Sequence, residues 1–375
     1  MNPATSATEN TARPVAGLGH AEPLLAVRNL RTYFDTPRGI VRAVDDVSFS
    51  VDRGRTIGIV GESGSGKTVL SRSVLNLLPK KATIPAGGEI LFEGRDLRPL
   101  SSKQMRSYWG PQLAMVFQDP MTSLNAVVKI GRQITEGLRE HTDLNHRAAE
   151  QEAVALLRSV GIPAPERRLG EYPHQLSGGM RQRVTIAIAM ACGPKLLIAD
   201  EPTTALDVTV QAQILDLLAR QQRERSMGMV LVTHDLGVVA NRTDEIAVMY
   251  AGQFVEKAPT PVIFGSMRHP YTEALMRSIP RIENPSHTRL DAIPGRPPDL
   301  ADLPRGCRFA PRCRNAQQRC LEENPPLFPG EQPGHEFRCF FPVGTPAGDE
   351  ARERNVRDGR TAAGIDMDTL TKASA

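Results

Sequence analysis

The chain has 375 residues, a length that predicts two or three domains. Its 40% apolar and 23% charged residues are typical of a globular protein, and its net charge of +4 shows no bias toward polyanions. The apolar run Val184–Cys192 has nine residues, against about 18 for a membrane span, and the N-terminus lacks the pattern of a secretory signal. Composition therefore argues against an integral membrane protein, a secreted disulfide scaffold and a disordered protein, and favours the cytosol.

Residues 1–22 and 344–375 lack any apolar period and are predicted to be flexible tails. Between them, short apolar or alternating segments predict the first strands of the fold. These strands are expected at Leu24–Leu30, Val44–Val51, Thr56–Val60, Glu89–Glu93 and Ala114–Phe117. A helix is expected to begin at about Lys67, directly after the glycine-rich segment that follows the third strand.

The second half of the chain begins with a helical pattern from about Asp119 to Arg183. The elements expected after it are a strand at Leu196–Ala199, a helix at Val208–Arg223, a strand at Met229–Thr233 and a hairpin at Ile246–Val255. Strands that alternate with helices predict a layered α/β core with parallel strands. From Pro259 onward, Pro, Arg and Cys dominate, which predicts a second, small region.

A phosphate loop is predicted where the third strand meets the first helix. The segment Gly61-Glu62-Ser63-Gly64-Ser65-Gly66-Lys67-Thr68 matches the motif G-x-x-x-x-G-K-[S/T]. Its glycines let backbone N–H groups converge on phosphate oxygens, and the N-terminus of the following helix reinforces that cradle. Lys67 is expected to reach the β- and γ-phosphates, and the Thr68 hydroxyl to hold Mg²⁺. The sequence therefore predicts nucleotide binding.

Two acidic residues end the strand that begins at Leu196. At the carboxyl end of a parallel strand, Asp200 can reach a metal beside the phosphate loop. Glu201 is then placed to orient or deprotonate the attacking water as general base. An exposed acid pair of no catalytic use is the alternative, and the phosphate loop upstream disfavours it.

Four further motifs appear in the order found in ATP-binding cassette (ABC) proteins. They are Gln118, Leu176-Ser177-Gly178-Gly179-Met180, Thr204-Ala205-Leu206-Asp207 and His234. The chain resembles this family over about residues 24–260, and the domain is expected to span 23–260. The resemblance implies an α/β nucleotide-binding fold with a phosphate-loop core, an antiparallel β subdomain and a helical subdomain at about 119–183. It also implies a head-to-tail dimer that holds two ATP molecules between its subunits.

The resemblance implies a role for each matching residue. Gln118 contacts Mg²⁺ together with Thr68 and Asp200, and it senses the membrane partner. His234 holds the γ-phosphate and the attacking water, and Asp207 links the two ATP sites. Ser177, Gly178 and Gly179 present helix N–H groups to the γ-phosphate bound by the opposite subunit. Met180 replaces the commoner Gln, and Phe34 is expected to stack on adenine, with Tyr33 as the alternative.

Four cysteines lie in the small C-terminal region. Cys307, Cys313, Cys320 and Cys339 are separated by 5, 6 and 18 residues, whereas Cys192 stands apart. Clustered thiols in a chain without an export signal favour a metal over disulfides. Zinc, an iron–sulfur cluster and unligated thiols all remain open, although gaps of five and six residues are wide for zinc.

The region at residues 261–343 resembles the C-terminal extension of ATP-binding subunits in oligopeptide, dipeptide and nickel importers. The strings His269-Pro270-Tyr271-Thr272-Glu273-Ala274-Leu275 and Ile293-Pro294-Gly295-Arg296-Pro297-Pro298 carry this resemblance together with the cysteines. Relatives with this cysteine pattern imply a 4Fe–4S cluster, and a structural role is expected for it. Redox sensing is the alternative role.

Together, these features predict the ATPase subunit of an importer for di- or oligopeptides. The resemblance implies a second, distinct ABC ATPase subunit, two transmembrane permease subunits and an extracytoplasmic solute-binding protein as partners. It places the chain at the cytoplasmic face of the cell membrane, and nucleic acid is not expected as a partner. Two alternatives remain: a soluble ABC ATPase that acts on nucleic acid or ribosomes, and an importer of nickel, glutathione or short sugars.

Overall fold

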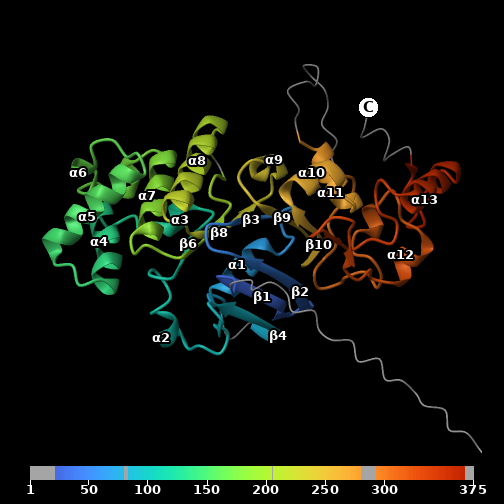
Figure 1. Cartoon of the computed structure of the whole chain (residues 1–375), viewed down its shortest axis with the longest axis horizontal. Helices are drawn as coiled ribbons and strands as arrows, with labels where there is room; N and C mark the ends of the chain where they lie inside the picture. Colours follow the sequence, from blue (N-terminus) through green and yellow to red (C-terminus); the bar gives the residue numbers. More distant parts are fainter. Residues whose placement is uncertain (1–21, 80–82, 205, 280–292, 368–375) are drawn as a thin grey trace, which may run out of the picture.

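The computed structural model describes residues 22–79, 83–204, 206–279 and 293–367. Two sheets form the centre of the molecule, with helices at both ends (Figure 1). The predicted N-terminal tail lies outside the described residues, except for Glu22. The observed arrangement contains the phosphate-loop core, the antiparallel sheet and the helical subdomain that the sequence predicts.

The smaller sheet is antiparallel and has the strand order β2-β1-β4-β5. Its strands are β1 (Leu25–Thr36), β2 (Gly39–Val51), β4 (Thr83–Phe92) and β5 (Arg95–Asp96). The alternation seen at the end of β2 is confirmed, because Val47, Phe49 and Val51 are all buried. These three side chains belong to a core cluster that also contains Ile57 and Ile59 of β3 (Thr56–Val60). The two sheets therefore share one apolar interior.

The larger sheet carries the predicted parallel core. Strand β3 lies beside β8 (Gly228–Thr233) and β9 (Glu245–Tyr250), and β7 (Leu196–Asp200) and β6 (Leu113–Val116) follow outward from β8, all in parallel register. Every residue of β3, β7 and β8 is buried, as expected of parallel strands that are covered on both faces. The predicted hairpin is confirmed: β10 (Gln253–Pro259) returns antiparallel to β9.

The helices between β6 and β7 form one end of the molecule, at the left in Figure 1. They are α3 (Pro120–Ser123), α4 (Ile130–His141), α5 (His146–Ser159), α6 (Pro165–Arg168) and α7 (Gly178–Met190). In α4, the side chains of Ile130, Ile134 and Leu138 recur every four residues and are fully or almost fully buried. Helical structure therefore occurs where the sequence predicts it, and α4, α5 and α7 share a core.

The remaining helices pack around the central sheets. Helix α1 (Lys67–Val74) follows β3, and α2 (Ser102–Met105) lies near the smaller sheet. Helix α8 (Val208–Glu224) connects β7 to β8, and α9 (Leu236–Val239) connects β8 to β9. Helices α10 (Thr260–Ser266) and α11 (Pro270–Arg277) lead into the C-terminal region. None of the helices in the described part of the chain combines the length and apolarity needed to cross a membrane.

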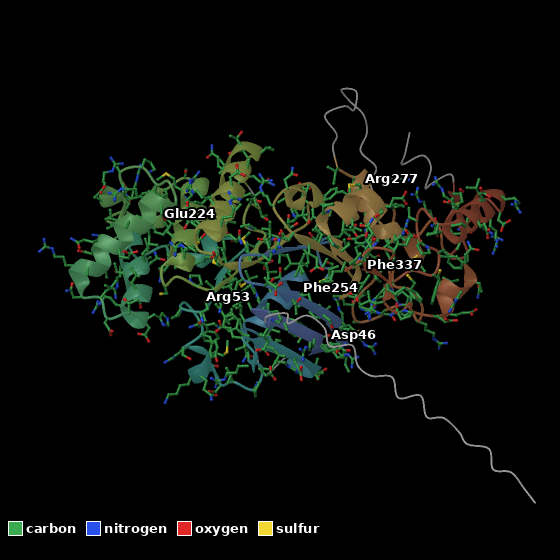
Figure 2. The ribbon with its side chains drawn as sticks, viewed as in Figure 1. Asp46, Arg53, Glu224, Phe254, Arg277 and Phe337 are labelled. Atoms are coloured by element: carbon green, nitrogen blue, oxygen red, sulfur yellow. The ribbon has the colours of Figure 1, made fainter. Side chains whose placement is uncertain are left out.

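The C-terminal region adds strands to the larger sheet and is not a separate layer. Strand β12 (Glu336–Phe337) pairs with β10, and β11 (Phe328–Pro329) pairs with β12. Phe254 of β10 and Phe337 of β12 are both buried and are labelled in Figure 2. Buried residues of the cysteine-bearing segment, among them Phe309 and Ala316, also share a core cluster with β9. The boundary expected near Pro259 therefore falls within a continuous core.

The prediction of a flexible tail at 344–375 is wrong for the residues that the structure describes. Helix α13 (Pro346–Arg357) begins after Thr345, whose hydroxyl accepts a hydrogen bond from the Gly348 N–H. Asn355 is buried, and its Oδ1 accepts a hydrogen bond from Gln317 Nε2 of the C-terminal region at 2.8 Å. Polar and small side chains make these contacts, so the segment has no apolar period for sequence reasoning to detect.

Candidate nucleotide-binding site

The phosphate loop lies between the end of β3 and the start of α1, as predicted. A Cβ atom at Gly61 would lie 2.1 Å from the carbonyl oxygen of Met249, so the backbone of β9 excludes any side chain there. Gly66 has a φ of +106°, and a Cβ there would lie 2.1 Å from the Ala43 carbonyl oxygen. The loop also contains Ser63, Gly64 and Ser65, and the buried Ser65 Oγ has no hydrogen-bond partner among the residues that the structure describes. Both glycines are thus required by their surroundings.

Lys67 points back into the loop rather than toward solvent. Its Nζ donates hydrogen bonds to the carbonyl oxygens of Gly61 at 2.7 Å and Glu62 at 3.0 Å. The side chain is only 4% exposed, and this burial lowers the pKa of the ammonium group. An anion in the loop would meet a preorganised cation that lacks full hydration.

Thr68 and Asp200 come together as predicted. The Thr68 hydroxyl donates to Asp200 Oδ1 at 3.3 Å, and so it joins the first turn of α1 to the end of β7. Asp200 is 1% exposed, and burial raises the pKa of its carboxyl group. A hydroxyl and a carboxylate are hard oxygen donors, the type that Mg²⁺ prefers, so this pair fits a magnesium ion beside the loop.

Glu201 is the centre of the site's hydrogen-bond network. Its Oε2 accepts from Gln118 Nε2 and from Thr204 Oγ1, both at 3.0 Å, and lies 3.5 Å from His234 Nδ1. Its Oε1 lies 3.8 Å from Lys67 Nζ. The three predicted catalytic residues Glu201, His234 and Gln118 are therefore assembled from the ends of β7, β8 and β6.

The charged groups of this network shift one another's pKa values. A hydrogen bond with His234 is the largest cause that lowers the pKa of Glu201, and burial opposes it. In return, the Glu201 carboxylate raises the pKa of His234 above its usual 6.5. Glu201 also has a positive φ of 46°, which is uncommon for a residue with a side chain. The carboxylate is ionised at neutral pH and held in one position, as a general base requires.

Ser177, Gly178 and Gly179, named here the signature residues, are not bonded to the phosphate loop of their own chain in the part that the structure describes. Ser177 caps α7, since its hydroxyl accepts from the Met180 N–H at 3.4 Å. Asp207 caps α8 in the same way, accepting from the Val210 N–H at 2.9 Å. In the described residues, no hydrogen bond or ion pair links Ser177, Gly178 or Gly179 to residues 61–68. The expectation that this segment contacts the nucleotide of an opposite subunit stays a prediction.

The two aromatic candidates for adenine stacking are adjacent on β1. Both Tyr33 and Phe34 are partly buried. The Tyr33 hydroxyl donates to Asp45 Oδ1 at 2.6 Å, and the guanidinium of Arg42 lies 5.9 Å from the Tyr33 ring centroid. Burial and this hydrogen bond raise the pKa of Tyr33 to about 12. The Tyr33 hydroxyl is thus already paired, and Phe34 remains the predicted adenine contact.

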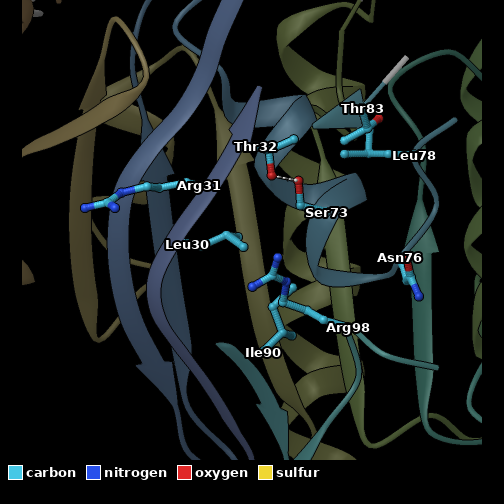
Figure 3. Close-up of a pocket in the computed structure, with 9 residues that line it drawn as sticks. All are labelled: Leu30, Arg31, Thr32, Ser73, Asn76, Leu78, Thr83, Ile90 and Arg98. Carbon is cyan, nitrogen blue, oxygen red and sulfur yellow. Dashed lines mark hydrogen bonds between the residues drawn. The ribbon is translucent and has the colours of Figure 1, made fainter. Parts of the chain in front are cut away.

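A pocket of about 290 Å³ lies near this sheet, between β1, β4 and the C-terminal end of α1 (Figure 3). Its polar side chains are already paired. The hydroxyls of Thr32 and Ser73 lie 3.0 Å apart, Asn76 Nδ2 donates to the Leu100 carbonyl at 3.1 Å, and Arg98 bonds the Gly88 carbonyl. We assign no ligand to this pocket.

The four C-terminal cysteines line one small cavity. Cys307, Cys313, Cys320 and Cys339 share it with His269, Phe309, Phe340 and Phe341, among others. None of the five cysteines of the chain forms a disulfide. Burial raises the pKa of all four thiols, to about 11 for Cys307. Within the described ranges, no three His, Cys, Asp or Glu side chains form a group that could hold a metal ion. The predicted metal-binding centre is therefore not confirmed.

Sequence reasoning missed contacts from the C-terminal region to the phosphate loop. The two terminal guanidinium nitrogens of Arg312, Nη1 and Nη2, donate to the carboxylate of Glu62. The Tyr271 hydroxyl accepts from the Glu62 N–H at 2.8 Å. Arg312 and Glu62 are 250 residues apart in sequence, so no local pattern could indicate their pairing. The only sequence signal was the position of Arg312 directly before a cysteine.

A glycine loop between a strand and a helix, with acidic residues ending a neighbouring strand, defines a phosphate-loop ATPase site. Comparison with known proteins agrees. The family model "ABC transporter" matches residues 44–204, and the model "Oligopeptide/dipeptide transporter, C-terminal region" matches residues 255–320. The dimeric structure of the ATP-binding cassette MJ0796 bound to ADP and Pi superposes with a TM-score of 0.57 at 25% identity, covering 63% of this chain and 98% of that one.

Full-length relatives are more similar still. The oligopeptide transport ATP-binding protein OppD of Bacillus subtilis is 52% identical over 305 residues, which cover 81% of this chain and 85% of that protein. The dipeptide transport ATP-binding protein DppD of Escherichia coli is 48% identical, with 85% and 97% covered. The chain therefore belongs to the ATP-binding subunits of oligopeptide and dipeptide ABC transporters.

Proposed function

We propose that this chain hydrolyses ATP to drive the import of di- or oligopeptides through separate membrane subunits. The observation that carries the proposal is the joining of Glu201 to Gln118, His234 and Lys67 in a single network. Such a network links the chemistry at the phosphate loop to Gln118, which precedes the helical subdomain. The names of the relatives, oligopeptide and dipeptide transport proteins, support peptides as the cargo.

In this proposal, ATP binds with its phosphates in the loop at residues 61–68 and its adenine against Phe34. Lys67 exchanges its bonds to the loop carbonyls for phosphate oxygens. Thr68, Asp200 and Gln118 would hold Mg²⁺, which would neutralise phosphate charge when bound. The support is the proximity of the Thr68 hydroxyl to the Asp200 carboxylate and the polar end of Gln118 beside Glu201.

Hydrolysis then uses Glu201 as the general base. The carboxylate accepts a proton from the attacking water, while His234 fixes the water and the γ-phosphate. Two observations support these roles. Glu201 is ionised, and its Oε2 accepts hydrogen bonds from Thr204 and Gln118. The imidazole of His234 lies 3.5 Å from the same Oε2 atom. General-base catalysis of this kind contributes a factor of about 10²–10⁴ in rate.

The active form is proposed to be a head-to-tail pair of ATPase subunits. Ser177, Gly178 and Gly179 would then meet the nucleotide on the opposite subunit, and Asp207 would lie between the two sites. An exposed apolar side chain beside Asp207 supports a partner at this surface, because Val208 is 83% exposed. The similar cassette MJ0796 is dimeric in its solved structures. We propose a second, distinct ABC subunit as this partner.

Permease subunits are proposed to dock beside Gln118. Three large apolar side chains within ten residues of it in sequence face solvent: Phe117, Met121 and Val127 are 38%, 58% and 81% exposed. Exposed apolar side chains on the segment that contains Gln118 are suited to a membrane partner whose movement must respond to ATP. The chain would thus lie at the cytoplasmic face of the membrane, and an extracytoplasmic solute-binding protein would deliver the peptide.

The four C-terminal thiols are proposed to hold a 4Fe–4S cluster with a structural role. The support is that Cys307, Cys313, Cys320 and Cys339 line the same small, largely apolar cavity. Four thiolates match the donor set of such a cluster, and burial favours neutral thiols until iron binds. A cluster needs its thiolates spread around a cube, whereas a single zinc ion needs all four to converge at about 2.3 Å.

Reconstitution tests the proposed function. Proteoliposomes that contain this chain, its partner ATPase and the permease pair should accumulate labelled peptide when ATP and the solute-binding protein are supplied. Uptake should disappear with a Glu201→Gln subunit, and a peptide-dependent rise in ATPase rate should disappear as well. ATP hydrolysis that peptides never stimulate, with uptake of nickel instead, would reject peptides as the cargo.

A further inference from the structure

The second residue of the phosphate loop is held by the C-terminal region. Arg312 Nη1 donates to Glu62 Oε2 at 2.6 Å, and Arg312 Nη2 donates to Glu62 Oε1 at 2.9 Å. This is the two-pronged geometry in which an arginine binds a carboxylate most strongly. The Arg312 side chain is 2% exposed and that of Glu62 is 26% exposed, so water screens the pair only on the Glu62 side.

The other polar atoms of Glu62 are also fixed. Its N–H donates to the hydroxyl of Tyr271 on α11 at 2.8 Å, and its carbonyl oxygen accepts from Lys67 Nζ at 3.0 Å. The backbone and the side chain of one loop residue thus contact two different elements of the C-terminal region. The Glu62 carbonyl oxygen is thus bonded to Lys67, the residue that is expected to bind phosphate.

Arg312 itself has little freedom to move. Its Nε donates to the Pro294 carbonyl at 2.8 Å and its Nη2 to the Ile293 carbonyl at 3.2 Å, and its guanidinium lies 5.8 Å from the Tyr250 ring centroid. The residue belongs to a short 3₁₀ helix, Ala310–Arg312, and precedes the buried Cys313. The guanidinium is therefore also held by contacts outside the phosphate loop, from the C-terminal region and from Tyr250 of β9.

We propose that Arg312 is a positioning residue for ATP binding, and that it acts on the phosphate loop through Glu62. The pair neutralises a carboxylate beside the site of the triphosphate and fixes the first turn of the loop. Without the guanidinium, Glu62 would present an unpaired negative charge there, and the bound triphosphate would repel it. This proposal rests on the nucleotide site described above and adds the C-terminal region to its scaffold.

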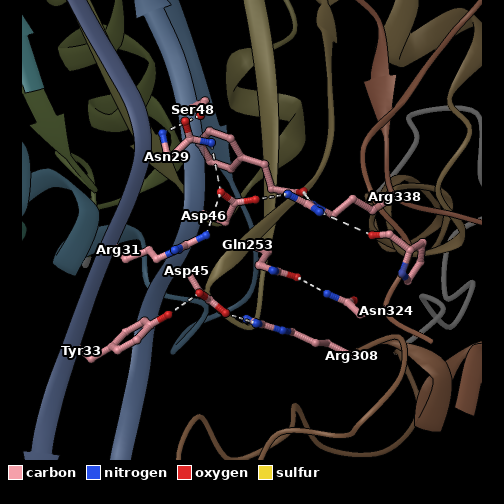
Figure 4. A network of polar contacts seen from close by, with 12 residues as sticks. Asn29, Arg31, Tyr33, Asp45, Asp46, Ser48, Gln253, Arg308, Asn324 and Arg338 are labelled. Carbon is pink, nitrogen blue, oxygen red and sulfur yellow. Dashed lines mark hydrogen bonds and ion pairs between the residues drawn. The ribbon is translucent and has the colours of Figure 1, made fainter. Parts of the chain in front are cut away.

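A second ion pair, Arg338–Asp46, provides a matched control, because it joins the C-terminal region to β2 and not to the phosphate loop. Arg338 Nη2 donates to Asp46 Oδ2 of β2 at 3.1 Å, and Arg338 Nε donates to the Phe254 carbonyl (Figure 4). The Arg338 side chain is 9% exposed, so it is a buried arginine of the same region. It has no contact with residues 61–68 among its hydrogen bonds and ion pairs in the described part of the chain.

The test is a double-mutant cycle on the full chain. The dissociation constant of MgATP is measured by calorimetry for wild type, Arg312→Ala, Glu62→Ala and the double variant, with Arg338→Ala as the control. We expect Arg312→Ala to raise the constant about tenfold when Glu62 is present and by less than twofold in the Glu62→Ala background. Arg338→Ala should lower the melting temperature but leave the constant within twofold of wild type.

Kinetics of the assembled transporter give a second readout. Arg312→Ala should raise the KM for ATP while kcat at saturating ATP stays within twofold, because Arg312 has no hydrogen bond or ion pair with Glu201 in the described part of the chain. Arg312→Lys keeps the charge but loses the two-pronged geometry, so its effect should be intermediate; it also serves if Arg312→Ala does not fold.

Two results would overturn the proposal. One is an Arg312→Ala dissociation constant equal to that of wild type. The other is an equal loss of affinity in both Glu62 backgrounds, since Arg312 would then act independently of the loop carboxylate. A wild-type chain that binds no ATP would instead reject the nucleotide site itself, and that outcome is distinct from a failure of Arg312.

Discussion

Substitution of Glu201 by glutamine tests the catalytic network most sharply. Glutamine has nearly the same size, and its amide oxygen can still accept from the Thr204 hydroxyl, which now lies 3.0 Å from Glu201 Oε2. The substitution removes the proton acceptor and the charge that faces Lys67 Nζ at 3.8 Å. The fold should be retained, and hydrolysis should be lost.

The expected loss of rate and the expected change in ATP affinity follow from the contacts of Glu201. Loss of a general base costs a factor of about 10²–10⁴ in rate, or ~3–5 kcal/mol in activation free energy. At 3.8 Å and an effective dielectric constant of ~20, the lost attraction to Lys67 is ~4 kcal/mol before desolvation is counted. In the proposed ATP complex, phosphate oxygens would take the place of the carboxylate as partners of Lys67. ATP affinity should therefore stay within a few-fold of wild type while turnover falls.

The assay compares steady-state phosphate release with equilibrium ATP binding and with the oligomeric state in ATP. Glu201→Gln should release phosphate at least 100-fold more slowly and accumulate as an ATP-bound dimer with its partner. Glu224→Gln makes the same chemical change on α8 at an exposed position (labelled in Figure 2) and should be indistinguishable from wild type. Turnover of Glu201→Gln within threefold of wild type would remove Glu201 as the base.

Three further predictions concern Lys67, His234 and the thiols. Lys67→Ala should weaken MgATP binding about 100-fold by calorimetry, since it removes a buried cation from the loop; unchanged affinity would contradict the loop's role. Glu201 raises the pKa of His234 above 6.5, so their ion pair stabilises the fold fully below pH 6.5 and is lost as pH rises through the folded-state pKa. The difference in melting temperature between wild type and His234→Ala should accordingly shrink as pH rises; a constant difference would refute the pair. Anaerobically purified protein should be brown and contain iron, and Cys313→Ser should lose both; a colourless, zinc-containing protein would reject the cluster.

The ATP-site geometry was largely accessible from the sequence because local rules govern it. A phosphate loop needs glycine where the backbone approaches closely, and Gly61 and Gly66 meet neighbouring carbonyls as the motif requires. The apolar run of β7 ends at the acid pair, so the hydrophobic pattern together with the phosphate loop upstream indicated Asp200 and Glu201. His234 and Gln118 were expected from the family resemblance. Both follow strand ends, and parallel strands bring those ends to one edge of the sheet.

The C-terminal region was less predictable because its contacts are polar and distant in sequence. Helix α13 packs through Ala351 and Asn355, which carry no apolar period. The Arg312–Glu62 pair joins residues 250 positions apart, and no spacing rule indicates it. The pairing of β12 with β10 likewise depends on two residues per strand. A single sequence therefore reveals local chemistry well and long-range polar contacts poorly.

The central claim is that one ATP is held by the phosphate loop of one subunit and by the signature residues of the other. Cryo-electron microscopy of the assembled transporter with the Glu201→Gln subunit, ATP and Mg²⁺ tests it directly. The account predicts that Ser177 Oγ lies within hydrogen-bonding distance of the γ-phosphate bound in the partner's loop. A closed, ATP-loaded complex in which Ser177 faces solvent would contradict it.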